Sequence, residues 1–301
     1  MISRRAILAG LPLLAAPARA QETKLPVVAT FSILADLTGR IGGARLELTT
    51  LVGPGNDAHV YNPTPDDARQ LAAAKLIIIN GLGYEGWIER LTKASAAKAP
   101  TVVATKGVKP IREAGGHGHG HAHGHERNDP HAWQSVANVK IYVANIRDGL
   151  IAADPAGEAI FRANATAYLA ELDALDKEIR DAIAAIPKER RRIITTHDSF
   201  AYFGATYGLN FIAPKGVSTE SEPSAADVGK IIRQIRAEKI PAVFLENVTD
   251  PRLMERIAKE SGAKIGGTLY SDALSAAGGP AASYVEMARS NLRALTAALA
   301  K

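Results

Sequence analysis

The 301-residue sequence contains no cysteine, and aromatic side chains make up only 5% of it. Without cysteine the chain forms no disulfide and offers no thiol that could carry a lipid. Few aromatic residues leave little material for a surface that stacks on bases. Long apolar runs are also missing, because Ala6 to Pro17 spans about a dozen residues and roughly 20 are needed to cross a bilayer. These absences exclude a membrane-spanning bundle and argue against a nucleic-acid partner.

Positive charge is concentrated in the first twenty residues. The formal net charge is +5, but Arg4, Arg5 and Arg19 stand there without any acid, and leaving them out lowers Lys and Arg from 36 to 33 against 31 acids, or +2. The arginine pair, the apolar run and the small residues around Arg19 predict a signal peptide over residues 1–20, cut before Gln21. We therefore expect a periplasmic protein that is exported and is not a lipoprotein.

Strand and helix patterns alternate in both halves of the remaining chain. Apolar, β-branched runs bounded by turn residues predict strands, and amphipathic stretches lie between them. This alternation is typical of an α/β fold, so we expect two similar lobes, each a mostly parallel four-stranded sheet flanked by helices. The expected strands are 25–31, 46–52, 76–80 and 101–104 in the first lobe and 192–196, 211–213, 242–246 and 264–270 in the second.

One long helix is expected to join the lobes. Residues 156–186 contain no internal proline and carry apolar residues at helical spacing, which predicts a helix of about 45 Å at 1.5 Å per residue. Pro187 ends it, and the alternative is two shorter helices broken near Ala170. The expected domains are an N-terminal lobe over 21–155, a linking spine helix over 156–186 and a C-terminal lobe over 187–301.

The eight histidines fall into two groups. One group alternates with Gly or Ala in a low-complexity run, residues 114–128, which has no apolar side chain larger than Ala and is expected to be disordered. Imidazoles in such a segment should bind zinc, copper or nickel in preference to manganese. This expected auxiliary, weak metal site comprises His117, His119, His121, His123 and His125.

The other three histidines, His59, His131 and His197, each stand at a loop that leads into an expected helix. Such loops meet at the carboxyl ends of the strands in open α/β sheets, where ligands bind. Asp272 occupies a similar place after the strand 264–270. A lone histidine there usually forms a structural hydrogen bond and a lone aspartate usually caps a helix, but the four together predict a metal site.

Three imidazoles and one carboxylate favour zinc, which accepts four nitrogen and oxygen ligands readily. Manganese and magnesium prefer more oxygen ligands, whereas copper and nickel remain open on affinity alone. Asp57 and Asp129 each precede a histidine by two residues. Each of them either orients the imidazole or is a simple turn or cap residue.

These motifs make the sequence resemble the metal-specific solute-binding proteins of ABC transporters, the cluster A-I group, in its zinc-binding branch. The resemblance covers essentially the whole mature chain. It lies in Asp57-Ala58-His59-Val60-Tyr61, in the run Ile79 to Trp87, in Asp129-Pro130-His131-Ala132-Trp133, in Thr196-His197-Asp198-Ser199-Phe200 and in Ser271-Asp272-Ala273-Leu274.

The resemblance implies two lobes joined by a rigid helix, with one Zn(II) held between them by His59, His131, His197 and Asp272 and delivered to a membrane permease. Some zinc members carry glutamate where Ala58 stands, which makes Asp272 the expected fourth ligand. Manganese-binding relatives carry glutamate at the position of His197, so the histidine supports zinc. We expect a monomer, with a periplasmic zinc chaperone as a further partner.

Other functions and metals stay open. A zinc metallohydrolase needs an open metal position and a general base, whereas Asp272 would close the fourth position, so we expect no enzyme. A periplasmic zinc buffer or chaperone without a permease would use the same site, and manganese or copper is the alternative metal. The spacing of Gly81, Gly83 and Gly86 is that of a dinucleotide loop, but no acid follows the next strand, so we expect a turn.

Two properties of the site are expected in advance. If the three imidazoles have ordinary pKa values, protons compete with the metal for them between about pH 7 and 5. Up to three protons would then be taken up when one metal ion is released. On metal loss we expect the loops around His131 and Asp272 to loosen, because the long helix would limit movement of the lobes.

Overall fold

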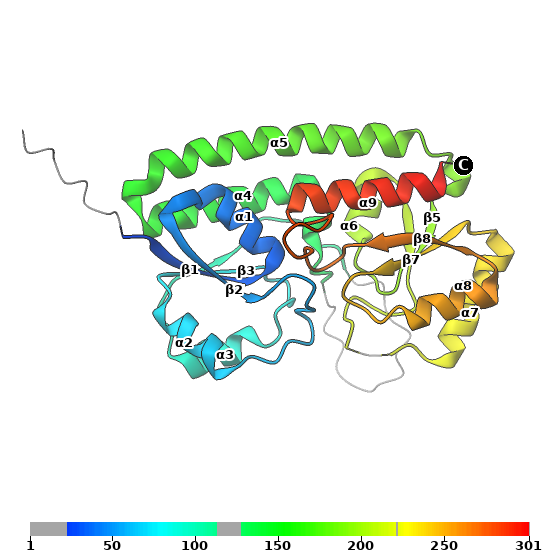
Figure 1. Cartoon of the computed structure of the whole chain (residues 1–301), viewed down its shortest axis with the longest axis horizontal. Helices are drawn as coiled ribbons and strands as arrows, with labels where there is room; N and C mark the ends of the chain where they lie inside the picture. The colour runs from blue at the N-terminus through cyan, green and yellow to red at the C-terminus, as the bar shows by residue number, and fades with distance from the viewer. Residues whose placement is uncertain (1–22, 113–127, 221, 301) are drawn as a thin grey trace, which may run out of the picture.

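Two parallel four-stranded sheets form the frame of the protein in the computed structural model, which describes residues 23–112, 128–220 and 222–300 (Figure 1). Their strand orders are β2-β1-β3-β4 and β6-β5-β7-β8, so both sheets are wound in the same way. Each pair of neighbouring strands is parallel. The strands are β1 Leu25–Phe31, β2 Leu46–Val52, β3 Leu76–Ile79, β4 Thr101–Val103, β5 Arg192–Ile194, β6 Asn210–Ile212, β7 Ala242–Glu246 and β8 Lys264–Leu269.

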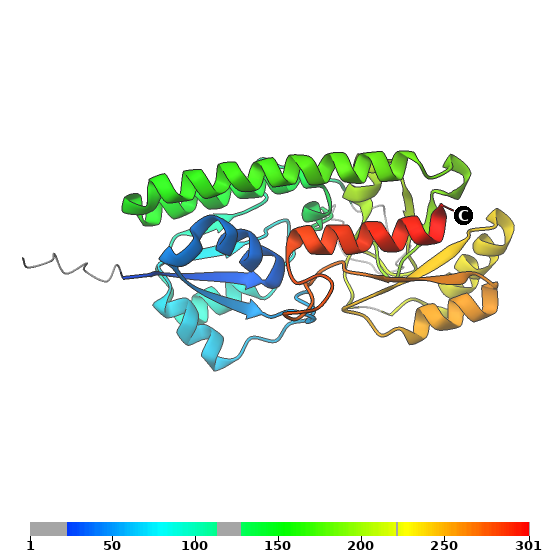
Figure 2. The same ribbon diagram turned by 45° about the horizontal axis from the view of Figure 1, so that its top comes forward.

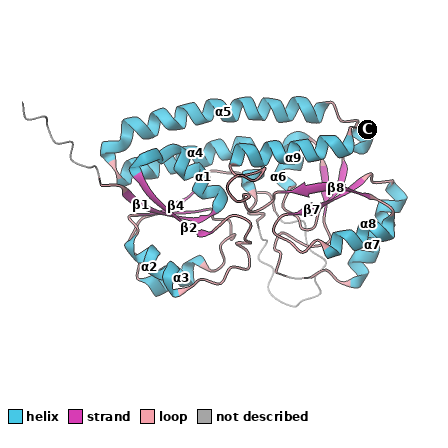
Figure 3. Ribbon diagram, viewed as in Figure 1, coloured by secondary structure: helices cyan, strands magenta, loops and turns pink. Residues whose placement is uncertain are grey.

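The expected α/β fold class is confirmed, and each expected strand agrees with an observed one to within two residues at either end. In both sheets the carboxyl ends of the strands point towards the middle of the molecule, where the lobes meet (Figure 3). Two sequence-based expectations lie outside the described residues: the signal peptide over residues 1–20, and the auxiliary site formed by the five histidines of the low-complexity run.

Helices cover both faces of each sheet, as parallel strands buried on both sides require. Below the sheets lie α2 and α3 in one lobe and α7 and α8 in the other, whereas α1, α4, α5 and α9 lie above (Figure 1). The helices are α1 Ser32–Gly42, α2 Pro65–Ala73, α3 Ile88–Ser95, α4 Val136–Ala153, α5 Glu158–Ala184, α6 Ala201–Tyr207, α7 Ala225–Glu238, α8 Arg252–Ser261 and α9 Tyr284–Leu299. In the described part of the chain, none of them is long and apolar enough to span a bilayer.

The helix α5 runs along both lobes without a break (Figure 2). It packs against α1 and α4 of the first lobe and against α6 and α9 of the second. Its buried side chains recur every three or four residues, so one apolar stripe faces the core over the whole length. The break considered near Ala170 is absent. A single hydrophobic cluster, which includes Leu37, Leu172 and Leu295, extends beneath α5 from one lobe into the other.

The contribution of α5 to stability can be tested at Leu172, which is completely buried. Leu172→Ala should lower the free energy of unfolding by roughly 2–5 kcal/mol, because the substitution removes apolar contacts and leaves a cavity. Ile160→Ala on the same helix is the matched control, since Ile160 is exposed, and it should change the value by less than about 0.5 kcal/mol. Urea unfolding measures both. Equal effects of the two substitutions would contradict the packing described for α5.

Candidate metal centre

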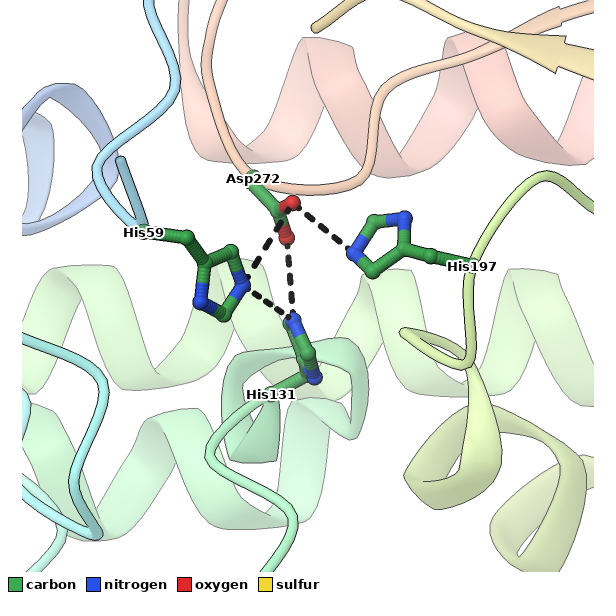
Figure 4. Close-up of side chains that lie close together, drawn as sticks. All are labelled: His59, His131, His197 and Asp272. Carbon is green, nitrogen blue, oxygen red and sulfur yellow. Dashed lines mark hydrogen bonds and ion pairs between the residues drawn. The ribbon is translucent and has the colours of Figure 1, made fainter. Parts of the chain in front are cut away.

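The loops at the carboxyl ends of the strands bring the four expected ligands together (Figure 4). His59 lies between β2 and α2, and His131 directly precedes a short 3-10 turn that leads into α4. His197 follows β5, and Asp272 follows β8. One ligand atom from each of the four side chains lies within 4.8 Å of all the others. Each lobe therefore supplies two side chains to one cluster.

The spacing within the cluster suits a small cation with four ligands. The Nε2 atom of His131 lies 3.1 Å from Nε2 of His59 and 3.3 Å from Oδ1 of Asp272. The Oδ2 atom of Asp272 lies 3.0 Å from Nε2 of His197 and 3.9 Å from Nε2 of His59. Four ligands at 2.0–2.1 Å from zinc form a tetrahedron whose edges measure about 3.3 Å. The observed separations scatter around that edge length.

Burial makes the charge of Asp272 costly unless positive charge, from a metal ion or from protonated imidazoles, compensates it. His131, His197 and Asp272 are each 0% exposed. Both carboxylate oxygens of Asp272 and the Nε2 atom of His197 have no hydrogen-bond partner of good geometry in the described chain. Buried polar atoms in proteins are normally satisfied, and an exception points to a missing ion or water. The donor set therefore fits a bound metal.

Two further carboxylates contact the Nδ1 atoms of His131 and His197, on the side of each ring that faces away from the cluster. Asp129 Oδ1 lies 2.7 Å from His131 Nδ1 and also accepts the backbone N–H of His131 at 2.9 Å. Glu246 Oε2 lies 2.5 Å from His197 Nδ1, while its Oε1 accepts the backbone N–H of His197 at 3.0 Å. A carboxylate at Nδ1 fixes the ring orientation and leaves Nε2 directed at the metal. Of the two roles expected for Asp129, the structure supports the one in which it orients the imidazole.

Asp57 takes the other expected role. Its Oδ1 accepts the backbone N–H of His59 at 2.8 Å, as in a turn, and within the described residues its carboxylate has no hydrogen bond to the imidazole. Glu246 was not predicted from the sequence, although it ends the apolar strand β7 at the same sheet edge. The signal that could have found it is this position: β7 pairs with β5, and His197 follows β5.

Side-chain hydrogen bonds from the first lobe fix the segments that carry His131 and Asp272. Trp133 Nε1 and Gln134 Nε2 both donate to the carbonyl of Ser271 at 2.8 Å, next to Asp272. Asn80 Nδ2 donates to the carbonyl of Pro130 at 2.9 Å. The bonds from Trp133 and Gln134 connect the two lobes directly beside the cluster, so His131 and Asp272 are held as one unit.

The glycine-rich run after β3 forms a turn, as expected, with positive φ at Gly81 and Gly83. A side chain at Gly81 would also meet Val103, so the position needs glycine for space and conformation. The turn places Tyr84 edge-on against His59, with 4.6 Å between the ring centroids. It also buries Glu85, whose Oε1 accepts the backbone N–H of Asn80 at 2.6 Å. The run therefore supports the cluster and does not form a dinucleotide loop.

The three histidines differ in their pKa values, because burial and neighbouring charges act on them to different extents. Burial lowers the pKa of His59 to about 3. Burial would also lower the pKa of His131, but the charges of Asp272 and Asp129 overcome it and raise this pKa to about 9. For His197 the charges of Glu246 and Asp272 likewise outweigh burial and raise the pKa well above its usual value. Burial would raise the pKa of Asp272, but His197 and His131 hold it well below its usual range. The expectation of three ordinary imidazoles that titrate between about pH 7 and 5 was wrong, because each ring has a different charged environment.

A two-lobed α/β fold with a stiff helix behind it and a buried cluster of metal donors between its lobes defines a metal-binding solute-binding protein. The chain belongs to the ZnuA family, described as zinc-uptake complex component A, periplasmic, which it matches over residues 27–298. Members are substrate-binding components of ABC transporters that work with a membrane permease.

Named relatives differ in the metal they bind. The chain is 33% identical over 278 residues to the manganese-binding lipoprotein MntA of Halalkalibacterium halodurans, covering 92% of this chain and 89% of that protein. It is 35% identical over 266 residues to the iron-binding protein YfeA of Yersinia pestis, covering 88% and 83%. The solved structure of the periplasmic zinc-binding protein TroA from Treponema pallidum superposes with a TM-score of 0.85 at 31% identity, covering 92% of this chain and 100% of that one.

These comparisons confirm a metal-binding protein of an ABC transporter and not an enzyme, because the relatives are named for binding a metal. They leave the metal itself open among manganese, iron and zinc. The expectation that the chain is not a lipoprotein was wrong on this comparison, because the Halalkalibacterium relative is named a lipoprotein. That expectation rested on the absence of cysteine.

The orienting role of the two carboxylates can be tested by removing their charge. Asp129→Asn and Glu246→Gln should each weaken metal binding by about 10- to 100-fold, because the imidazole loses the partner that fixes its orientation. Asp66→Asn is the control, since Asp66 is exposed on α2 and its carboxylate accepts bonds from Arg69 and Gln70 of the same helix. Competition with a chelating dye measures the affinities. Wild-type affinity in both site variants would show that the contacts are only structural.

The unequal pKa values predict how many protons leave when a metal binds. At pH 7 binding should release about two protons, because His131 and His197 are protonated in the metal-free protein and His59 is already neutral. Raising the pH removes these competing protons, so affinity should rise with pH through about 9, the pKa of His131 in the metal-free protein. Calorimetric titration in two buffers of different ionisation enthalpy counts the protons. Release of none or of three would contradict the assignment.

Proposed function

We propose that the protein captures Zn(II) with His59, His131, His197 and Asp272 and delivers it to the permease of a zinc ABC transporter. The observation that carries this proposal is the donor set, three imidazole nitrogens and one carboxylate at tetrahedral spacing. Zinc has no geometric preference from its d electrons and takes such a set readily. Manganese lies at the low end of the affinity order and favours oxygen-rich, higher-coordinate sites.

Charge in the surrounding residues supports a divalent cation. Asp272 alone supplies one negative charge to the ligand set, and two of the three imidazoles are backed by the carboxylates of Asp129 and Glu246. A carboxylate behind a coordinating imidazole makes the ring a better donor. The site can therefore bind a strongly charged ion while only one carboxylate contacts it.

The proposal also includes the expected oligomeric state, partners, domain division and auxiliary metal site. The protein acts as a monomer, with a permease and a periplasmic zinc chaperone as its partners, and its lobes divide at the linking helix 156–186. The histidine-rich run collects zinc weakly beside the main site through His117, His119, His121, His123 and His125. Imidazole-rich tracts bind metals of the zinc and copper group, which supports this role.

Metal titration tests the proposal. The full chain should bind one zinc ion tightly and manganese roughly 100-fold more weakly or worse, because three nitrogen ligands disfavour manganese. Deleting residues 115–125 should keep the tight zinc site and remove only weaker binding. His131→Ala should weaken tight binding strongly, whereas the matched change His125→Ala should leave it intact.

Two results would contradict the proposal. If the deletion variant had no tight site, the four ligands would be wrongly assigned. If manganese or iron bound more tightly than zinc to the full chain, the ligand set would stand and the metal would be wrong.

A further inference from the structure

His59 is held less firmly than the other three ligands. Its side chain is 6% exposed, whereas those of His131, His197 and Asp272 are 0% exposed. Carboxylates contact the Nδ1 atoms of His131 and His197. Within the described residues no carboxylate contacts Nδ1 of His59. The face of the cluster formed by His59 is therefore the side that is nearest to solvent and has the fewest restraints.

The loop that carries His59 is fixed at its end and beside the ligand. At its end, Thr64 and Asp67 form a capping box at the start of α2. Beside the ligand, Trp87 Nε1 donates to the carbonyl of Ala58 at 2.8 Å. Both contacts come from the first lobe, so neither ties His59 to the lobe that supplies His197 and Asp272.

Two bonds reach this loop from the second lobe: the backbone N–H of Gly55 donates to the carbonyl of Leu274 at 2.9 Å, and one side-chain bond comes from Thr219. Thr219 Oγ1 donates to Asp57 Oδ2 at 2.5 Å, while Oδ1 of the same carboxylate accepts the backbone N–H of His59 at 2.8 Å. Thr219 stands in the segment after β6, whose start is fixed beside His197 by the bond from Lys215 N to the carbonyl of Thr196. Asp57 thus connects the backbone of one ligand to a segment anchored next to another ligand.

We propose that Thr219 is a positioning residue for metal retention: through Asp57 it holds His59 closed over the metal, and metal enters and leaves by movement of the His59 turn. This rests on the proposed metal-binding function. Metal loss would then loosen the loop around His59 first. The loops around His131 and Asp272, which we expected to loosen, are joined to each other by Trp133 and Gln134.

Release kinetics test the role of the Thr219 hydroxyl. Zinc-loaded full-length protein is mixed with excess EDTA, and zinc loss is followed with time. Thr219→Val keeps the shape of the side chain and removes the donor, so it should release zinc about 10-fold faster, as expected for loss of a hydrogen bond to a charged group. Thr219→Ser keeps the hydroxyl and should release at the wild-type rate. Thr166→Val, on the exposed side of α5, is the matched control and should also be unchanged.

Two outcomes would overturn the proposal. Release from Thr219→Val at the wild-type rate would show that the hydrogen bond does not retain metal. Release from Thr219→Ser as fast as from Thr219→Val would show that the hydroxyl does not retain the metal, because serine keeps it. Failure of the metal-binding function itself would be recognised separately, because the wild-type protein would then show no tight zinc site in the titration.

Discussion

The structure depends on one buried carboxylate, that of Asp272, placed where both lobes meet. A fully buried charge is tolerated only when it is paired. Here His131 and His197, one from each lobe, lie beside Asp272, and the surrounding carboxylates raise the pKa of both imidazoles, which favours their charged form when no metal is bound. A divalent ion that displaces two protons brings the same charge that they remove. The total charge of the site is then equal in the two states, so the lobes face no large electrostatic penalty for staying close when the metal has gone.

Constraint elsewhere in the fold concentrates movement in the loops. The stripe of α5 and the shared hydrophobic cluster hold the backs of both lobes together, so a wide swing would expose continuous core. The loops at the strand ends are joined across the lobes by individual hydrogen bonds, such as those from Trp133 and Gln134 to Ser271. Conformational change in this protein is therefore expected at the scale of one turn, and different ligands of the same metal can differ in mobility.

Sequence alone predicted the strands, the long helix and the four donors, because apolar periodicity is local and because only three histidines lie outside the low-complexity run. It could not distinguish the roles of Asp57 and Asp129, because both stand in the pattern Asp-x-His. Their tertiary contacts differ: Asp57 binds Thr219 and a backbone N–H, whereas Asp129 binds an imidazole. Glu246 was missed because acids are common, and its importance depends on β7 lying next to β5. The order of pKa values depends on burial and charge at distances that no linear motif reports.

The identical winding of the two sheets places His131 and Asp272 in corresponding positions, each beyond the fourth strand of its sheet. Asn80 and Glu246 correspond in the same way at the third strands, and each steadies a ligand-bearing segment. The halves thus behave as two copies of one scaffold that present different side chains at matching places. Exchanging an imidazole for a carboxylate at such a place alters the chemical hardness of the donor set and leaves every strand untouched. An architecture of this kind can diversify in metal preference through single substitutions, which is consistent with relatives of one fold being named for manganese, iron and zinc.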